Sequence, residues 1–150
     1  MLQELFTRIE RLEARLNQMV RIGTVKTLYP ETGRVRVTIA DADGLLSYTL
    51  PVLYPKTHAD RHYHMPDAGE HVICVFLPIG LEQGFVIGAF YSAADPVPVA
   101  DSDKHHIRFK DGTVIEYDRK AGVMEVRCVN EIRIQAAAHV HVRAARIDMN

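Results

Sequence analysis

Two histidines near the end of the chain have the spacing of metal ligands. His139 and His141 lie two positions apart, so both side chains fall on the same side of an extended segment. Imidazole nitrogens bind transition metals well, and copies of this pair from several chains could surround one ion. However, Val140 and Val142 hold the alternate positions, and turning the histidines inward would turn these valines outward. Surface histidines are therefore the favoured interpretation, and we expect no metal site here.

A second group of histidines lies in a long polar stretch between residues 54 and 70. His62 and His64 are spaced as in metal motifs that add a nearby carboxylate. Glu70, however, follows His64 by six positions, and Pro66 interrupts the strand that such a motif needs. A solvated or interface loop is favoured. A metal enzyme built on the histidines between positions 58 and 71 stays open as an alternative.

Residues suited to covalent catalysis are poorly placed. Ser47, Ser92 and Ser102 stand outside any Gly-x-Ser-x-Gly turn. Cys74 and Cys128 lie in apolar, strand-like runs, where a nucleophilic thiolate is not favoured. No pair of acidic residues stands out, and no glycine-rich loop has the spacing of a phosphate site. We therefore expect no catalytic residue and no enzyme, with both cysteines buried and reduced in a protein made in a cytoplasm.

The overall composition excludes a strong preference for charged partners. The 150 residues include 18 Lys and Arg against 19 Asp and Glu, which gives a net charge of -1. Such a chain has no global attraction for nucleic acid or anionic lipid. A hydrophobic content of 47% is ample for a buried core. No apolar run approaches the roughly 18 residues of a membrane span, so we expect neither a membrane helix nor an export signal.

The N-terminal segment, residues 1–20, is predicted to be an amphipathic helix. Its apolar side chains recur at alternating steps of three and four, the spacing of a coiled-coil seam. The seam consists of Leu5, Ile9, Leu12 and Leu16. The narrow stripe favours self-association, although packing of the helix on its own domain stays open as an alternative.

Residues 21–93 are predicted to form a small β-barrel. Five β-rich runs are separated by turns rich in Gly, Pro and Asp, and none has a helical pattern. The runs cover 23–29, 33–39, 45–53, 71–77 and 85–91. Five such strands are typical of an OB-fold barrel. Residues 94–103, which are rich in Pro and Asp, are predicted to be an exposed linker.

Strand-like alternation dominates residues 104–150. Asp111-Gly112 predicts a hairpin turn, and every even-numbered position from 124 to 144 except Asn130 is apolar. One strand of that length would reach roughly 70 Å at about 3.3 Å per residue, too long for a compact domain. Because no helix is left to cover the apolar side, copies of the chain must bury it in a β-prism. Its predicted core is Met124, Val126, Ile132, Ile134, Val140 and Val142.

The order and spacing of several motifs resemble the central tail spike, or baseplate assembly protein V, of contractile-tailed phages. The motifs cover residues 21–25, 33–37, 65–72 and 84–88, followed by the Pro96 and Pro98 linker. The most specific is the run His106-Ile107-Arg108-Phe109-Lys110-Asp111-Gly112-Thr113-Val114-Ile115-Glu116-Tyr117-Asp118.

The resemblance implies a mostly β fold, in which an OB-fold barrel precedes an intertwined trimeric β-helix. It implies a homotrimeric structural protein that joins the baseplate hub and tail tube and is driven through the host outer membrane. Such a protein is made in the host cytoplasm, resides in the virion tail baseplate and binds no nucleic acid. Family members often end in a tip with a His-x-His iron site. Because no Gly-rich tip sequence precedes Asn150, we expect a truncated spike, with iron only in a longer chain or after a register slip.

A binding module is the alternative function. An OB-fold can grip single-stranded nucleic acid or an oligosaccharide through exposed aromatic residues interleaved with Lys and Arg. The long loop offers Tyr54 and Tyr63, but Lys56 and Arg61 are its only basic residues. Since such a module would leave the alternating C-terminal segment unexplained, the spike is the preferred interpretation.

Overall fold

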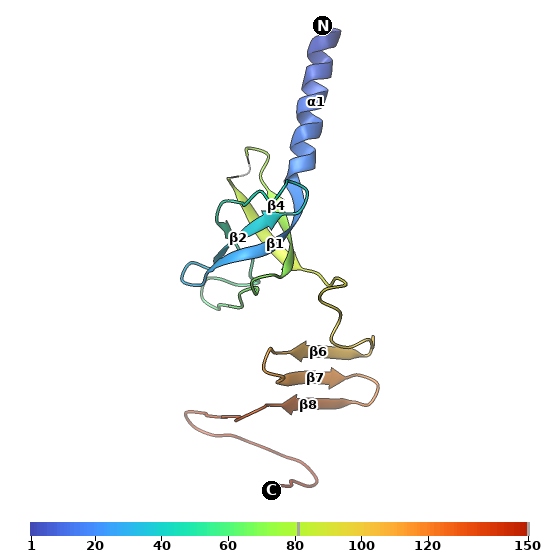
Figure 1. Ribbon diagram of the computed structural model, residues 1–150. Coiled ribbons are helices and arrows are strands. Elements are labelled where there is room, and N and C mark those ends of the chain that lie inside the picture. Colours follow the sequence, from blue (N-terminus) through green and yellow to red (C-terminus); the bar gives the residue numbers. More distant parts are fainter. Residues whose placement is uncertain (81, 150) are drawn as a thin grey trace. The chain divides into compact units, whose positions relative to one another are not determined.

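The computed structural model describes residues 1–80 and 82–149 of the chain (Figure 1). The chain divides into two units, Met1–Pro96 and Val97–Asn150, at a point inside the segment expected to be a linker. Leu81, in a predicted turn, and Asn150, the last residue of the predicted spike segment, lie outside the described residues.

A single helix, α1 (Leu2–Met19), opens the N-terminal unit, as the seam pattern predicts. None of its residues is buried, and only Met19, beside the first strand, is half-buried. The helix therefore presents its apolar stripe to solvent in the single chain. No helix among the described residues combines the length and apolarity needed to cross a membrane.

Five strands of the N-terminal unit form one sheet. They are β1 (Val20–Tyr29), β2 (Arg34–Ile39), β3 (Leu50–Pro51), β4 (His71–Phe76) and β5 (Gly84–Ala89). Their order in the sheet is β3-β2-β1-β4-β5, with every neighbouring pair antiparallel. A parallel bridge between Val52 and Val86 brings the two edges together. The result is a nearly closed five-stranded barrel, which agrees with the predicted OB-fold.

The third predicted strand, 45–53, is wrong in extent. Leu50–Pro51 pairs as a strand, and Leu46 and Val52 form only isolated bridges, with Thr38 and Val86. Between them the buried Ser47 hydroxyl accepts the Val37 N–H at 2.9 Å and donates to the Tyr48 carbonyl at 2.7 Å. Side-chain hydrogen bonds thus replace part of the strand ladder, a local competition that alternation in the sequence does not reveal.

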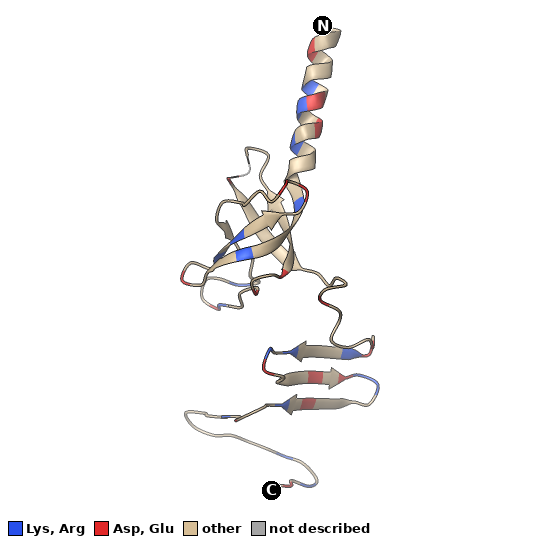
Figure 2. Cartoon of the chain, viewed as in Figure 1, with Lys and Arg blue, Asp and Glu red and all other residues tan. Residues whose placement is uncertain are grey.

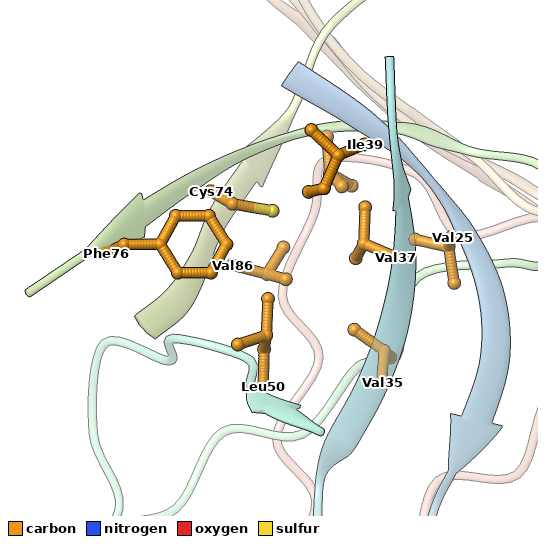
Figure 3. Close-up of a cluster of buried hydrophobic side chains, with 9 residues drawn as sticks. Val25, Val35, Val37, Ile39, Leu50, Cys74, Phe76 and Val86 are labelled. Atoms are coloured by element: carbon orange, nitrogen blue, oxygen red, sulfur yellow. The ribbon is translucent and has the colours of Figure 1, made fainter. Parts of the chain in front are cut away.

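The core of the barrel is built from alternate residues of the strands (Figure 3). Its buried members are Val25, Val35, Val37, Ile39, Leu50, Val72, Cys74, Phe76 and Val86. β-Branched valines predominate because they suit a pleated strand that is buried on one face. Cys74 is a free thiol in this core, as expected, and burial raises its pKa to about 11.

Two glycines permit close approach between strands of the barrel. A Cβ added at Gly23 would overlap the side chain of Val37 and lie 2.7 Å from the carbonyl oxygen of Thr38. A Cβ at Gly84 would lie 2.6 Å from the ring of Phe76. Neither position leaves room for a larger residue without displacement of its neighbours.

The second unit contains a separate three-stranded antiparallel sheet (Figure 1). Its strands are β6 (Lys104–Arg108), β7 (Val114–Asp118) and β8 (Val123–Arg127), in that order. The predicted hairpin at Asp111-Gly112 is confirmed. Gly112 has a φ of +94°, a conformation that glycine adopts without strain, and Asp111 Oδ1 accepts the Thr113 N–H at 2.8 Å.

The long alternating segment does not form an extended strand in the single chain. β8 ends at Arg127, and residues 128–149 contain neither helix nor strand. Apart from half-buried Cys128, all of these residues are exposed, so the prediction that Cys128 lies buried in a strand is wrong. A strand requires hydrogen-bonding neighbours, and none is available to this segment within its own chain. The trimeric β-helix stays a prediction.

Candidate assembly interface

One face of the C-terminal sheet carries apolar side chains that nothing covers in the single chain. The register pairs Ile107 with Ile115 and Ile115 with Val126, so these three side chains form a row across all three strands. The adjacent row holds His105, Tyr117 and Met124. Exposed fractions run from 37% at Ile115 to 71% at Met124. We call the five apolar residues of these rows, Ile107, Ile115, Tyr117, Met124 and Val126, the apolar ladder. An uncovered ladder of this kind is typical of a surface that associates.

The structure brings only part of the predicted prism core into this ladder. Met124 and Val126 belong to it, beside Ile107, Ile115 and Tyr117, which share the same period-two alternation. The remaining predicted core residues lie in the irregular segment, with exposed fractions between 54% and 76%. They are Ile132, Ile134, Val140 and Val142.

The opposite face of the sheet holds a charge cluster that sequence reasoning missed. Glu116 on the central strand accepts a hydrogen bond from Lys104 Nζ at 2.8 Å, and its second oxygen lies 2.6 Å from His106 Nδ1. Only 16% of the Glu116 side chain and 12% of the His106 side chain are exposed. The sequence did contain a signal for this pair. His106 and Glu116 are equally far from Asp111 in the hairpin turn, and a hairpin places two such residues opposite each other.

Hydrogen bonding shifts the pKa values of this cluster in opposite directions. The donors Lys104 and His106 stabilise the carboxylate and hold the pKa of Glu116 below its usual value. The same carboxylate raises the pKa of Lys104. Glu116 and Lys104 therefore both favour the charged state near neutral pH, and the cluster links β6 to β7 beneath the apolar ladder.

The helix provides a second uncovered apolar surface. The seam residues Leu5, Ile9, Leu12 and Leu16 are each between 50% and 66% exposed. Arg and Glu residues alternate along the helix around this seam (Figure 2). Within the described part of the chain, none of these charged helix residues forms an ion pair. Both the seam and the charges beside it are thus available to another molecule.

A third apolar surface lies on the outside of the barrel. Val20 of β1, Val75 of β4 and Phe85 of β5 occupy one register row, and Ile22 pairs with Ile73 in the next. Val20, Ile22 and Phe85 are exposed, whereas the alternating residues of these strands fill the core. The surface begins directly after α1 in the sequence.

The histidines of the long loop are not gathered into a metal site. Among residues 1–80 and 82–149, no three His, Cys, Asp or Glu side chains are placed to hold one ion. The His64 ring meets Tyr54 edge-on with centroids 5.4 Å apart, and Tyr54 stacks on Tyr63 at 6.1 Å. His71 belongs to β4, where its Nδ1 lies 3.7 Å from Asp95 Oδ2. Both histidine-bearing ends of the loop thus contact other groups, His64 an aromatic ring and His71 a carboxylate.

The C-terminal pair, His139 and His141, lies with its rings stacked. The ring centroids are 5.7 Å apart and the ring planes differ by 10°. Both side chains are exposed, and both lie in the irregular segment beyond β8.

A cavity of about 530 Å³ opens on the N-terminal unit, beside the end of β5. Its lining includes the carboxylates of Asp67, Glu70 and Asp95 together with the rings of Phe90 and Tyr91. Three carboxylates in one cavity repel the negatively charged phosphate groups of a nucleic acid. The cavity therefore does not favour the alternative of a nucleic-acid site.

Comparison with known proteins finds a phage protein that is similar in sequence to this chain. No model of a protein family matches it. The chain is 30% identical over 132 residues to the protein named "Spike protein" of Escherichia phage P2. The matched region covers 88% of this chain and 61% of that protein. The match is longer than either structural unit, so it includes parts of both. The chain spans about three fifths of this curated relative's length. This similarity to a phage spike protein confirms the resemblance predicted from the sequence.

Proposed function

We propose that this protein is a non-enzymatic structural component of a phage tail baseplate, or of a phage-tail-like particle. Three copies form a needle that pierces the host outer membrane when the tail sheath contracts. Its other partners are the hub and tail tube proteins of the baseplate. Its relationship to the phage P2 spike protein supports the spike role.

The observation that carries this proposal is the exposed apolar ladder of the C-terminal sheet. Full burial of a large apolar side chain stabilises a folded or assembled state by about 1.5 to 3 kcal/mol. The exposed apolar ladder lacks this stabilisation in the single chain. The alternation continues from β8 to residue 144, where the single chain offers no neighbouring strand. Identical chains around one axis supply both the apolar cover and the missing hydrogen-bonding neighbours. The number three comes from the family resemblance.

An iron centre has no part in this proposal. In the prism, Val140 and Val142 take the inward positions, so His139 and His141 fall on the outer side. The residues present therefore do not fit an axial His-x-His iron site.

The alternative of an OB-fold binding module has little support. Lys56 Nζ pairs with Asp60 at 2.6 Å, and Arg61 Nε donates to the His58 carbonyl at 2.9 Å. Both basic residues of the long loop are thus engaged within the loop itself. The nearby cavity is acidic, so a polyanion would be repelled.

The absolute mass of the purified full chain, measured by light scattering on a sizing column, tests the assembly. We expect a mass near three chains. Ile134→Lys should abolish or weaken the trimer, because it would place three charges near one axis. Gln135→Lys is the matched control, since its side chain belongs to the outer track. A monomeric wild-type chain would overturn the proposal, and an Ile134→Lys trimer of unchanged thermal stability would overturn the inward assignment.

The baseplate role is tested separately on intact particles. Tail particles purified from bacteria that produce this chain would be labelled with an antibody against it and viewed by electron microscopy. Label confined to the baseplate end supports the proposal. Label along the sheath or on the head of the particle contradicts it.

A further inference from the structure

Helix α1 has the features of a helix that needs a partner. The helix has 18 residues, and in proteins most of the stability of such a helix comes from packing of its apolar face. Here the seam of Leu5, Ile9, Leu12 and Leu16 remains at least half exposed. Met19, at the end of the helix, is its one half-buried residue, and the other helix residues are exposed. Cover for the seam must therefore come from outside the chain.

The charges beside the seam define an orientation. With Leu2, Ile9 and Leu16 at heptad position a, Arg8 falls at position g and Glu13 at the following position e. In a parallel coiled coil in register, position g of one helix contacts position e of its neighbour, five residues further along. Arg8 of each copy would then meet Glu13 of the next. Each Arg8 and each Glu13 then has one oppositely charged neighbour around the axis.

An antiparallel arrangement would bring like charges together instead. It places position g against position g, which sets Arg8 of one helix beside Arg15 of the other. Like charges held together in this way are unfavourable. The charge pattern therefore discriminates between the two orientations, and it also identifies a second copy of this chain as a complementary occupant.

We propose that α1 pairs with the α1 helices of other copies in a parallel coiled coil in register, oriented by ion pairs between Arg8 and Glu13 of neighbouring chains. The inference rests on the proposed function for the identity of the partner. It adds an N-terminal contact that is separate from the apolar ladder. Parallel helices start all chains from the same end, which is the cyclic symmetry that a one-pointed needle requires.

A charge-reversal cycle in the full chain tests the proposal. The variants are Arg8→Glu, Glu13→Arg and the double variant, and the readout is thermal melting of the helix by circular dichroism at 222 nm. α1 is the only helix among the described residues, so it dominates this signal. We expect each single reversal to lower the midpoint by several degrees and the double variant to recover most of the loss.

Recovery in the double variant separates contacts between helices from contacts within one helix. Residues 8 and 13 are five apart, and only side chains three or four apart touch on one helix. The double reversal therefore cannot repair an intrahelical loss. Arg11→Glu, on the outer position c, is the matched control and should lack such coupling to Glu13→Arg. If Arg8→Glu raises the midpoint, the parallel orientation is overturned, and if the double variant shows no recovery, the ion pair is overturned.

Cysteine cross-linking checks the register independently. In a Cys128→Ser background, Leu5→Cys should form a disulfide between copies on mild oxidation, because position 5 meets position 5 in the parallel arrangement. Thr7→Cys, on the outer side, should remain a free thiol. A disulfide that forms only when Leu5→Cys and Leu16→Cys chains are mixed would show the antiparallel arrangement and overturn the inference.

The two proposals can fail separately. If the wild-type chain is a trimer sensitive to Ile134→Lys but the reversal cycle shows no coupling, the helix inference fails and the needle stands. If coupling appears while Ile134→Lys remains a stable trimer, the inward assignment of Ile134 fails and the helix pairing stands.

Discussion

His106 and Glu116 lie directly opposite each other on β6 and β7, with Nδ1 and Oε2 2.6 Å apart. Their neighbours along the strands, Ile107 and Ile115, are paired on the reverse face of the same hairpin. One side of the hairpin therefore holds an internal ion cluster while the other side holds the apolar ladder. The first links the strands within a chain, and the second is available for association between chains.

Acid should destabilise the C-terminal sheet through Glu116. Its folded-state pKa lies below the unfolded value of about 4.3, chiefly because Lys104 and then His106 donate hydrogen bonds to it. Its contribution to stability is therefore complete above the unfolded pKa and is lost as pH falls through the folded pKa. We expect Glu116→Gln to flatten this acid-dependent loss, measured by thermal melts from pH 7 to pH 3. Equal acid profiles for wild type, Glu116→Gln and the exposed control Glu125→Gln would contradict the assignment.

Gly23→Ala should destabilise the barrel by about 1 to 3 kcal/mol, because the added methyl group overlaps Val37 and crowds the Thr38 carbonyl. Urea denaturation followed by circular dichroism measures the loss. Gly88→Ala is the matched control on β5, since a Cβ there meets no atom within 4 Å. A Gly23→Ala protein as stable as the Gly88→Ala protein would show that β1 and β2 can separate without cost.

Cys74 should resist alkylation in the native protein. Burial raises the pKa of its thiol to about 11, so both access and thiolate content are low at pH 8. Cys128, half-buried and with its pKa lowered by hydrogen bonds from the Asn130 backbone and the Thr113 side chain, is the internal comparison. Mass spectrometry after iodoacetamide treatment should show modification of Cys74 only on unfolding. Protection of Cys128 that appears on assembly would report packing of the C-terminal segment, and rapid native labelling of Cys74 would refute its burial.

Deletion of residues 1–20 should weaken assembly without abolishing it. The apolar ladder remains in the shortened chain, whereas the contribution of the helix seam is lost. Sedimentation equilibrium over a range of concentrations gives the change in dissociation constant. Complete dissociation of the shortened chain would mean that the helix, and not the C-terminal sheet, is the principal association element.

Much of the architecture follows from local pattern. Three-four spacing of leucines predicts α1, and Asp111-Gly112 with its alternating flanks predicts the β6–β7 hairpin. Such features depend on neighbours within a few residues, so the sequence by itself determines them. The most specific motif of the family resemblance, His106 to Asp118, is also contiguous, and the similarity to a phage spike protein agrees with that resemblance.

Other features depend on residues that are distant in the sequence, and only the tertiary structure decided them. Ser47 shortens the third strand because its hydroxyl reaches the Val37 N–H on another strand. Val52 meets Val86 to bring the barrel edges together, and Lys104 joins the Glu116 carboxylate from the far end of a hairpin. Periodicity shows which side of a strand is apolar, but register and closure depend on which strands meet. Residues 128–149 have no hydrogen-bonding neighbours within one chain, so their alternation forms no strand there.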